Sequence, residues 1–174
     1  MTQDGKCIYV EDLINDPNFN TDDYYGYVYM TTNLETGRQY IGKKIFKHTT
    51  NKKLGKKELA TLPAQRGRVP SKKKIVKESD WKTYYGSADE VKQWVKTTPT
   101  DKLTRIVLRL CKSSKELTYY ETKYLFDYNV LVDQNKWVNS SILGKFFPKD
   151  LASQEEGYIL VVMVNQALIA ITNR

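Results

Sequence analysis

Two stretches near the N-terminus combine aromatic and β-branched residues with small and polar ones. Residues 24–31 read Tyr-Tyr-Gly-Tyr-Val-Tyr-Met-Thr, and residues 38–42 read Arg-Gln-Tyr-Ile-Gly. Both compositions favour β-strands. Residues 33–37 lie between them and have the chemistry of a turn, with Gly37 available for a positive φ angle. The pattern predicts a β-hairpin.

The middle of the chain carries one further strand pattern and two helix signals. Apolar and polar residues alternate over 102–111, which predicts a third strand. Residues 87–90 and 113–116 each have Ser followed three residues later by Glu, a capping box that opens a helix. We expect the first helix to begin near Ala88 and the second to run to about Tyr128. The order predicts an α+β fold: a small three-stranded sheet, mixed or antiparallel, flanked by helices.

We divide the chain into a central domain with a segment on either side. Residues 1–23 are acidic and are predicted to form an N-terminal arm. Residues 24–148 form the domain, within which residues 43–80, rich in lysine and broken by Gly and Pro, are predicted to be largely loop. Residues 149–174 form a C-terminal extension. Its apolar stretch 158–171 fits either a hairpin or a buried helix, because periodicity does not separate the two.

Charge is distributed very unevenly along the chain. The formal net charge is +8, yet residues 43–82 alone hold 14 lysine and arginine residues against three acids. Residues 1–25 hold six acids against one base. A lysine-rich run is either a solvated loop or a flap that contacts phosphates. The second interpretation predicts binding that weakens steeply with salt, because each neutralised phosphate releases counterions.

The composition argues against several classes of protein. Hydrophobic residues make up 40% of the chain and charged residues 28%, which fits neither a disordered tail nor a membrane protein. The longest apolar run is too short to span a bilayer, and no apolar leader pattern opens the sequence. Cys7 and Cys111 lie far apart, which favours neither a disulfide framework nor a zinc site. We expect a cytoplasmic protein.

The predicted hairpin carries two tyrosines that share one face. With a turn centred near residues 34–35, Tyr29 and Tyr40 lie opposite each other on the sheet. Gly42 follows them, and a glycine within a strand marks a close approach of other atoms. The pair either braces the sheet or presents two phenols to a ligand.

A carboxylate lies within the apolar face of the last predicted helix. Leu117, Glu121, Tyr124, Leu125 and Tyr128 share this face at helical spacing. A buried carboxylate must be paired, neutral or bound to metal, because desolvating it alone is too costly. Glu121 is therefore predicted either to form a salt bridge with a lysine or to bind a divalent ion such as Mg²⁺.

These residues resemble the signature of a known nuclease family. Residues 27–29 (Tyr-Val-Tyr) and, after ten intervening residues, 40–42 (Tyr-Ile-Gly) are similar to the paired motif of the GIY-YIG endonucleases. Glu121 on the helix, Asn139 near the end of the domain and the order of elements are similar too. The segment 78–87 resembles a phage-encoded branch of the family, in which a basic loop follows the hairpin.

The resemblance implies metal-dependent hydrolysis of phosphodiester bonds in double-stranded DNA, with one Mg²⁺ or Mn²⁺ ion on Glu121. It implies that Tyr40 activates or positions the attacking water and that Tyr29 assists. A phenol with a pKa of about 10 serves as a base only where neighbouring cations lower that pKa, and we expect the basic loop to supply them. For a phage-encoded enzyme the location would be the host cytoplasm.

The chain departs from the family pattern at two positions. The usual Arg eight residues after the second motif is replaced by Thr50, and the His four residues later by Leu54. If the basic loop is an insertion, Tyr84 would stand where the His would, and Arg68 or Lys44 would supply the cation. The predicted substrate contacts are Gly42, Lys43, Lys82 and Asn139.

Two other functions stay open at this point. The missing Arg and His would suit a DNA-binding protein that kept the fold and lost the chemistry. The acidic arm and the apolar C-terminal segment would suit an interaction protein, in which the arm competes with DNA for the basic loop. The sequence leaves the oligomeric state and the DNA sequence specificity undetermined.

Overall fold

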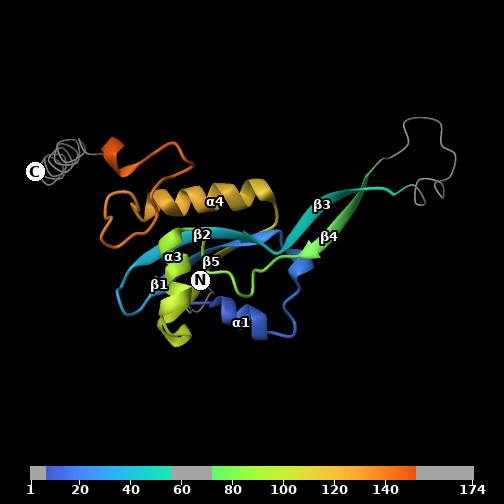
Figure 1. Cartoon of the computed structure of the whole chain (residues 1–174), viewed down its shortest axis with the longest axis horizontal. Helices are drawn as coiled ribbons and strands as arrows, with labels where there is room; N and C mark the ends of the chain where they lie inside the picture. Colours follow the sequence, from blue (N-terminus) through green and yellow to red (C-terminus); the bar gives the residue numbers. More distant parts are fainter. Residues whose placement is uncertain (1–6, 56–71, 152–174) are drawn as a thin grey trace, which may run out of the picture.

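The computed structural model describes residues 7–55 and 72–151. Figure 1 shows a small sheet with helices on both faces and a two-stranded ribbon that leaves the body of the molecule. Short 3-10 helices occur at Thr21–Asp23, Thr100–Lys102 and Pro148–Leu151. In chain order the main elements are α1 (Val10–Asn15), β1 (Gly26–Asn33), β2 (Gln39–Ile45), β3 (Lys47–Lys53), β4 (Lys72–Glu78), α3 (Asp89–Thr97), β5 (Leu103–Cys111) and α4 (Ser114–Asp127).

The main sheet has three strands, as the hydrophobic pattern predicts. Its order is β2-β1-β5, and β1 pairs antiparallel with both neighbours. Successive side chains of a strand point to opposite faces, so Tyr27, Tyr29 and Tyr40 join one core while Val28 and Ile41 join the other. The predicted α+β fold is confirmed, and the sheet is antiparallel throughout.

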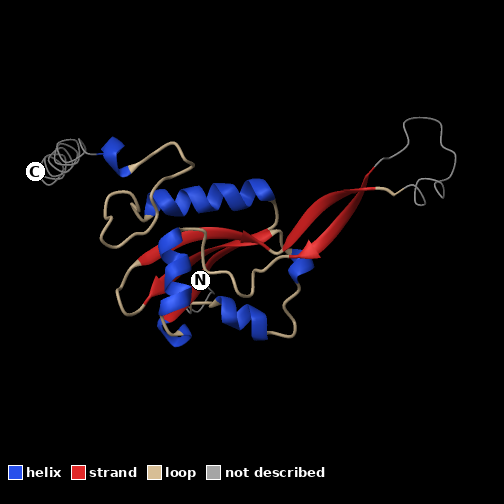
Figure 2. Ribbon diagram, viewed as in Figure 1, coloured by secondary structure: helices blue, strands red, loops and turns tan. Residues whose placement is uncertain are grey.

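Each face of the sheet is covered by a different part of the chain (Figure 2). On the face that carries the tyrosines, α1 and α3 contribute Val10 and Trp94 to the core. On the opposite face, α4 contributes Leu117 and Leu125, and the segment that follows it adds Trp137. Strand β2 forms one edge of the sheet, so the two layers meet along it.

Both helices begin near the predicted positions, but only one of the two predicted capping boxes forms. At the start of α4 the Ser113 hydroxyl accepts the N–H of Glu116 at 3.1 Å, and this cap is confirmed. At the start of α3 the predicted cap is wrong. Ala88 occupies the N-cap position and no side chain caps the helix, because the hydroxyl of Ser87 contacts Tyr40 instead.

Over its described residues, 43–55 and 72–80, the basic segment is largely strand and not the loop that the sequence predicts. Strands β3 and β4 pair antiparallel from Lys47 opposite Glu78 to Lys53 opposite Lys72. Nearly all of their side chains are exposed, so the apolar alternation that reveals a half-buried strand is missing. The part of the segment that contains Arg68 lies outside the described residues.

The acidic segment 1–23 is not a separate arm over its described part. Val10 and Leu13 of α1 are buried in the core. Glu11 of the same helix forms an ion pair with Arg105 of β5, with 2.6 Å between Oε1 and Nη2. The segment therefore belongs to the domain, and an arm that detaches to compete with DNA does not fit this packing.

The C-terminal extension is described up to residue 151. The choice between a hairpin and a helix for residues 158–171 falls outside the described residues. None of the helices in the described part of the chain has the length and apolar character that crossing a membrane requires.

Candidate active site

The two motif tyrosines lie on the same face of the sheet but not directly opposite each other. Tyr29 of β1 pairs with Gly42 of β2, and Tyr40 pairs with Thr31. The predicted register is therefore wrong by two residues, and the rings are diagonal neighbours with centroids 6.4 Å apart. Side chains alternate between the faces of a strand, so a register shift of two residues leaves Tyr29 and Tyr40 on the same face, as predicted.

Two glycines let the Tyr40 ring pack tightly. A Cβ atom added at Gly42 would lie 2.7 Å from both the Tyr29 hydroxyl and Cε1 of Tyr40, and one added at Gly86 would lie 2.9 Å from the same Cε1. Any larger residue at either position would force buried ring atoms to move. Gly42 therefore has a packing role in holding the two tyrosines, and a substrate contact by Gly42 stays a prediction.

The two hydroxyl groups have different surroundings. The hydroxyls of Tyr40 and Ser87 form a hydrogen bond of 2.9 Å. The Tyr29 hydroxyl is buried and has no hydrogen-bond partner among the described residues. An unpartnered buried hydroxyl costs free energy, so Tyr29 carries a hydrogen-bond donor that the described part of the fold leaves unused.

Burial holds both phenols in the neutral form. Loss of hydration raises the pKa of Tyr29 well above its ordinary value. Loss of hydration also raises the pKa of Tyr40, although the hydrogen bond from Ser87 opposes that rise. Glu121 adds to the rise at both tyrosines through its negative charge. The expectation that neighbouring cations lower these pKa values is therefore wrong for the protein alone.

Glu121 of α4 forms a salt bridge at the mouth of the site. Its Oε2 lies 2.8 Å from Nζ of Lys43, and the two side chains are 18% and 36% exposed. Lys43 also donates to the Thr118 hydroxyl at 3.1 Å. The salt bridge that the sequence offered as one of two alternatives is therefore present, and water still reaches both partners.

Tyr40 and Glu121 open onto the same pocket. It has a volume of about 240 Å³ and lies along the β2 edge, where the two layers meet. The tyrosine side contributes Tyr40, Ser87 and Ala88, and the α4 side contributes Glu121 and Leu125. The pocket leaves room beside Glu121 for an ion or a phosphate, so the salt bridge with Lys43 does not close it.

Asn139 holds the strand that forms one wall of the pocket. Its Oδ1 accepts the N–H of Ile41 at 3.0 Å, and its Nδ2 donates to the Ile41 carbonyl at 2.8 Å. These two bonds pair backbone groups that β2 would otherwise expose at its free edge. Asn139 therefore positions the neighbouring Tyr40, and a substrate contact by Asn139 stays a prediction.

Lys44 and Lys82, two other predicted cations that the structure describes, are not part of the pocket wall. Nζ of Lys44 lies 2.6 Å from the Asp80 carboxylate and 3.6 Å from the centre of the Tyr84 ring. Lys82 forms an exposed salt bridge with Glu78 at 3.1 Å. Of these three lysines, Lys43 therefore lies beside Glu121. Lys44 and Lys82 form their salt bridges elsewhere, with Asp80 and Glu78.

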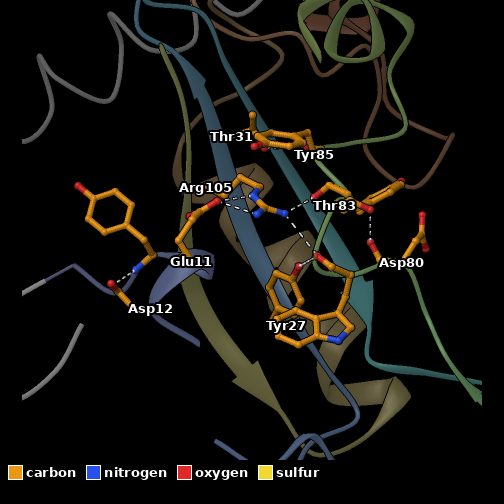
Figure 3. A network of polar contacts seen from close by, with 11 residues as sticks. Glu11, Asp12, Tyr27, Thr31, Asp80, Thr83, Tyr85 and Arg105 are labelled. Atoms are coloured by element: carbon orange, nitrogen blue, oxygen red, sulfur yellow. Dashed lines mark hydrogen bonds and ion pairs between the residues drawn. The ribbon is translucent and has the colours of Figure 1, made fainter. Parts of the chain in front are cut away.

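A buried arginine fixes the segment that carries Tyr84 and Ser87. Arg105 donates to the carbonyl oxygens of Trp81 at 3.4 Å and Tyr84 at 3.1 Å, while Glu11 balances its charge. Figure 3 shows its guanidinium on the tyrosine face of the sheet, between α1 and this segment. The Thr31 hydroxyl adds a bond of 2.6 Å to the carbonyl of Tyr85. Strands β1 and β5 thus hold the segment that carries Ser87 in the position where its hydroxyl reaches Tyr40.

Comparison with known protein families shows to which family the chain belongs. Residues 9–142 match the family described as "Putative endonuclease segE, GIY-YIG domain". The chain belongs to this GIY-YIG family. No curated protein and no solved structure matches the chain. Membership implies a nuclease that acts on nucleic acid, and nucleases of the GIY-YIG family generally use divalent metal ions.

The GIY-YIG site fits a single divalent ion. No cluster of three or more His, Cys, Asp and Glu side chains occurs among the described residues, so Glu121 would act as a lone carboxylate ligand. Mg²⁺ is commonly bound by one or two carboxylates, with water and substrate phosphates completing its shell. The open pocket beside Glu121 suits that arrangement.

Sequence reasoning missed two residues of this GIY-YIG site. Ser87 was interpreted as a helix cap, although its position after Gly86 is also consistent with a close approach to a ring. Arg105 stands among the polar residues of the strand predicted over 102–111, and the alternating pattern predicts no role for it. Its signal was available, because Leu103 and Val107 on either side share its inward face, and a charge at an inward position needs a structural partner.

Proposed function

We propose that this protein is a metal-dependent endonuclease that hydrolyses phosphodiester bonds in double-stranded DNA. The observation that carries the proposal is that Tyr40 and Glu121, from opposite layers of the fold, open onto one pocket. A nuclease needs a site for the attacking water and a site for the charged phosphate. In this proposal Tyr40 lies at the site for the water, and Glu121 lies at the site for the phosphate and its metal ion.

Each residue has a distinct task in this proposal. Glu121 holds Mg²⁺ or Mn²⁺, which when bound supplies positive charge for the phosphate in the transition state. The Tyr40 hydroxyl, oriented by its 2.9 Å bond with Ser87, positions the attacking water. Once the phenol has lost its own proton to solvent, the resulting phenolate accepts a proton from that water. Lys43 exchanges its contact with Glu121 for a phosphate oxygen of the DNA. Tyr29 assists with its unused hydroxyl hydrogen, although it does not itself line the pocket.

The proposal is tested by nicking of supercoiled plasmid in Mg²⁺. We expect Glu121→Gln to lower the rate at least about 100-fold, because it removes the charged ligand of the ion. Asp127→Asn is the matched control, since Asp127 lies on the same helix and pairs only with Lys123. EDTA should abolish cleavage by the wild type. Equal nicking by the wild type and Glu121→Gln would refute the proposal.

A second candidate function is DNA binding without cleavage. It is favoured by the Lys43–Glu121 salt bridge and by the raised pKa of Tyr40, which opposes a role as base. This function predicts salt-sensitive binding in EDTA, equal for wild type and Glu121→Gln, with no nicking in any divalent ion. A gel-shift titration run beside the plasmid assay separates the two functions.

A further inference from the structure

Strands β3 and β4 form a ribbon that carries little core of its own. Each strand has seven residues, and the pair forms a separate two-stranded sheet. In Figures 1 and 2 the two strands leave the body of the molecule side by side. All of their side chains are exposed except those of Lys47 and Ile75, which are half-buried. An isolated two-stranded ribbon is marginally stable in water, so contact with a partner would stabilise this one.

The outer half of the ribbon places lysines directly opposite one another. Lys53 lies opposite Lys72, and Lys52 lies opposite Lys73. Like charges in directly opposed cross-strand positions destabilise a sheet. The two strands carry seven lysines and one acid, Glu78 at the base, and Lys47 forms a salt bridge with Asp22 of the domain. The excess of positive charge at Lys52, Lys53 and Lys72 suits a polyanion, whose counterions bound lysines release.

The middle of the ribbon is uncharged and differs on its two faces. Thr49 lies opposite Val76 on one face, and Thr50 lies opposite Ile75 on the other. The Thr50 hydroxyl contacts the Ile75 carbonyl at 3.5 Å. Within the described part of the chain the side chains of Thr49 and Asn51 make no hydrogen bond, and Val76 is 59% exposed. One face thus presents a hydroxyl, an amide and methyl groups together, with Lys74 opposite Asn51.

These are the groups that distinguish base pairs. Asn pairs with the adenine edge, Thr bonds to either kind of base edge, and methyl groups contact the thymine methyl. The major groove of B-DNA is about 12 Å wide and admits a two-stranded ribbon. The A-form groove of duplex RNA is too narrow and deep for it. Lysines on either side of the uncharged middle match the phosphates that flank a groove.

We infer that the β3–β4 ribbon enters the major groove of duplex DNA and reads base edges with Thr49, Asn51 and Val76. This inference rests on the proposed function for its substrate. The base of the ribbon is fixed to the domain, because the N–H of Phe46 bonds to the Tyr25 carbonyl at 3.1 Å. The ribbon therefore holds DNA in a set direction relative to the pocket.

The connection also limits how far the bases that are read lie from the bond that is cut. Asn51, the base-reading residue of β3 farthest from the site, lies eight positions after Lys43, the partner of Glu121. Eight strand residues span at most about 26 Å, which is about eight base pairs at about 3.4 Å each. We expect the preferred bases to lie within about eight base pairs of the cleaved bond.

The first experiment selects preferred sequences from a pool of random DNA duplexes bound to the full-length protein in EDTA. The wild type should enrich a short motif, and the double variant Thr49→Ala, Asn51→Ala should lose at least about tenfold in discrimination. Thr50→Ala, on the other face, is the matched control and should keep the motif. Retention of the motif by the double variant would overturn the inference, and so would the absence of any motif for the wild type.

The second experiment measures the salt dependence of binding. The double variant Lys53→Gln, Lys72→Gln should reduce the slope of log affinity against log salt by about 2 and leave the motif unchanged. Lys123→Gln on α4 is the control and should leave the slope as it is. An unchanged slope for the ribbon variant, or equal affinity for duplex RNA and duplex DNA, would contradict the inference.

Failure of the inference and failure of the proposed function give different results. All of the ribbon side chains that are changed are exposed, so folding should be unaffected, and melting temperatures check this. A wild type that selects a motif but does not nick plasmid refutes the nuclease and supports the ribbon. A double variant Thr49→Ala, Asn51→Ala that keeps both motif and nicking refutes the ribbon and supports the nuclease.

Discussion

The hydroxyl groups of Tyr40 and Ser87 lie 2.9 Å apart, although the two residues come from β2 and from the segment that precedes α3. Burial raises the pKa of Tyr40, and this hydrogen bond lowers it. The serine therefore sets how easily the phenol gives up its proton. The contact links an edge strand to a segment that Arg105 holds from the far strand of the sheet.

Removal of this hydroxyl should shift the pH dependence of cleavage. Ser87→Ala removes an interaction that lowers the pKa of Tyr40, so that pKa should rise and the alkaline-favoured limb of the pH–rate profile should move to higher pH. At neutral pH we expect the rate to fall severalfold, because a smaller share of the Tyr40 phenol is ionised. Ser141→Ala, from the same pocket, is the control. The same profile for both variants would contradict the role of Ser87.

Tyr29→Phe should separate stability from activity. The hydroxyl that it removes is buried without a partner in the described structure, so the free energy of unfolding should stay unchanged or rise by about 1 kcal/mol. Plasmid nicking should fall at least about tenfold. Tyr27→Phe is the matched control, because the Tyr27 hydroxyl donates to the Trp81 carbonyl at 3.1 Å and its loss should cost about 1 kcal/mol. Equal destabilisation by both variants in denaturant titrations would speak against this interpretation.

Asn139→Ala should destabilise the fold by about 2–3 kcal/mol. The substitution leaves the N–H and carbonyl of Ile41 buried and unpaired, and each unpaired group costs about 1–3 kcal/mol. Urea unfolding measures the change. Asn135→Ala, at an exposed position nearby, should stay within about 0.5 kcal/mol of the wild type. A small effect at Asn139 would mean that water replaces the amide and that the residue is free to contact substrate.

Stability should decline in alkaline solution. The pKa values of Tyr27, Tyr29 and Tyr40 are raised in the folded protein by burial. Below the unfolded-state pKa of about 10 their contribution is fully present, and it is lost as pH rises above that value toward the folded pKa values. Each tyrosine should contribute a slope of up to about 1.4 kcal/mol per pH unit.

Urea unfolding between about pH 9 and pH 11 checks this slope. Tyr40→Phe should reduce it by the share of one tyrosine, whereas Tyr119→Phe should not, because Tyr119 is 63% exposed. A stability that stays constant over this pH range in the wild type would show that the three phenols ionise within the folded protein.

The main sheet and α4 were predictable because their sequences carry clear signals. Aromatic and β-branched residues mark β1, which is buried on both faces. Alternation marks β5, and an apolar stripe marks α4. The register was two residues out because Asn33 forms a longer turn than expected, with its N–H bonded to the Arg38 carbonyl at 3.0 Å. The β3–β4 ribbon was not predictable, because strands exposed on both faces leave no hydrophobic pattern.

The site was predictable only in part. The spacing of the motifs and the helical face of Glu121 brought Tyr29, Tyr40 and Glu121 to one region, and the structure joins two of them in a pocket. The partners of the cations were not predictable. Lys44 meets Asp80 and Lys43 meets Glu121 across distances that depend on how the layers pack, and a lysine-rich sequence offers many equivalent choices.

The pocket has walls from two layers that close over an edge strand. During translation both tyrosines leave the ribosome about eighty residues before Glu121, counted along the chain. A growing chain therefore holds the phenols without the acid, and under the proposed function it would not cleave nucleic acid until α4 docks. Under the same proposal, an opening that lifts α4 from the sheet would separate Glu121 from Tyr40 and stop cleavage.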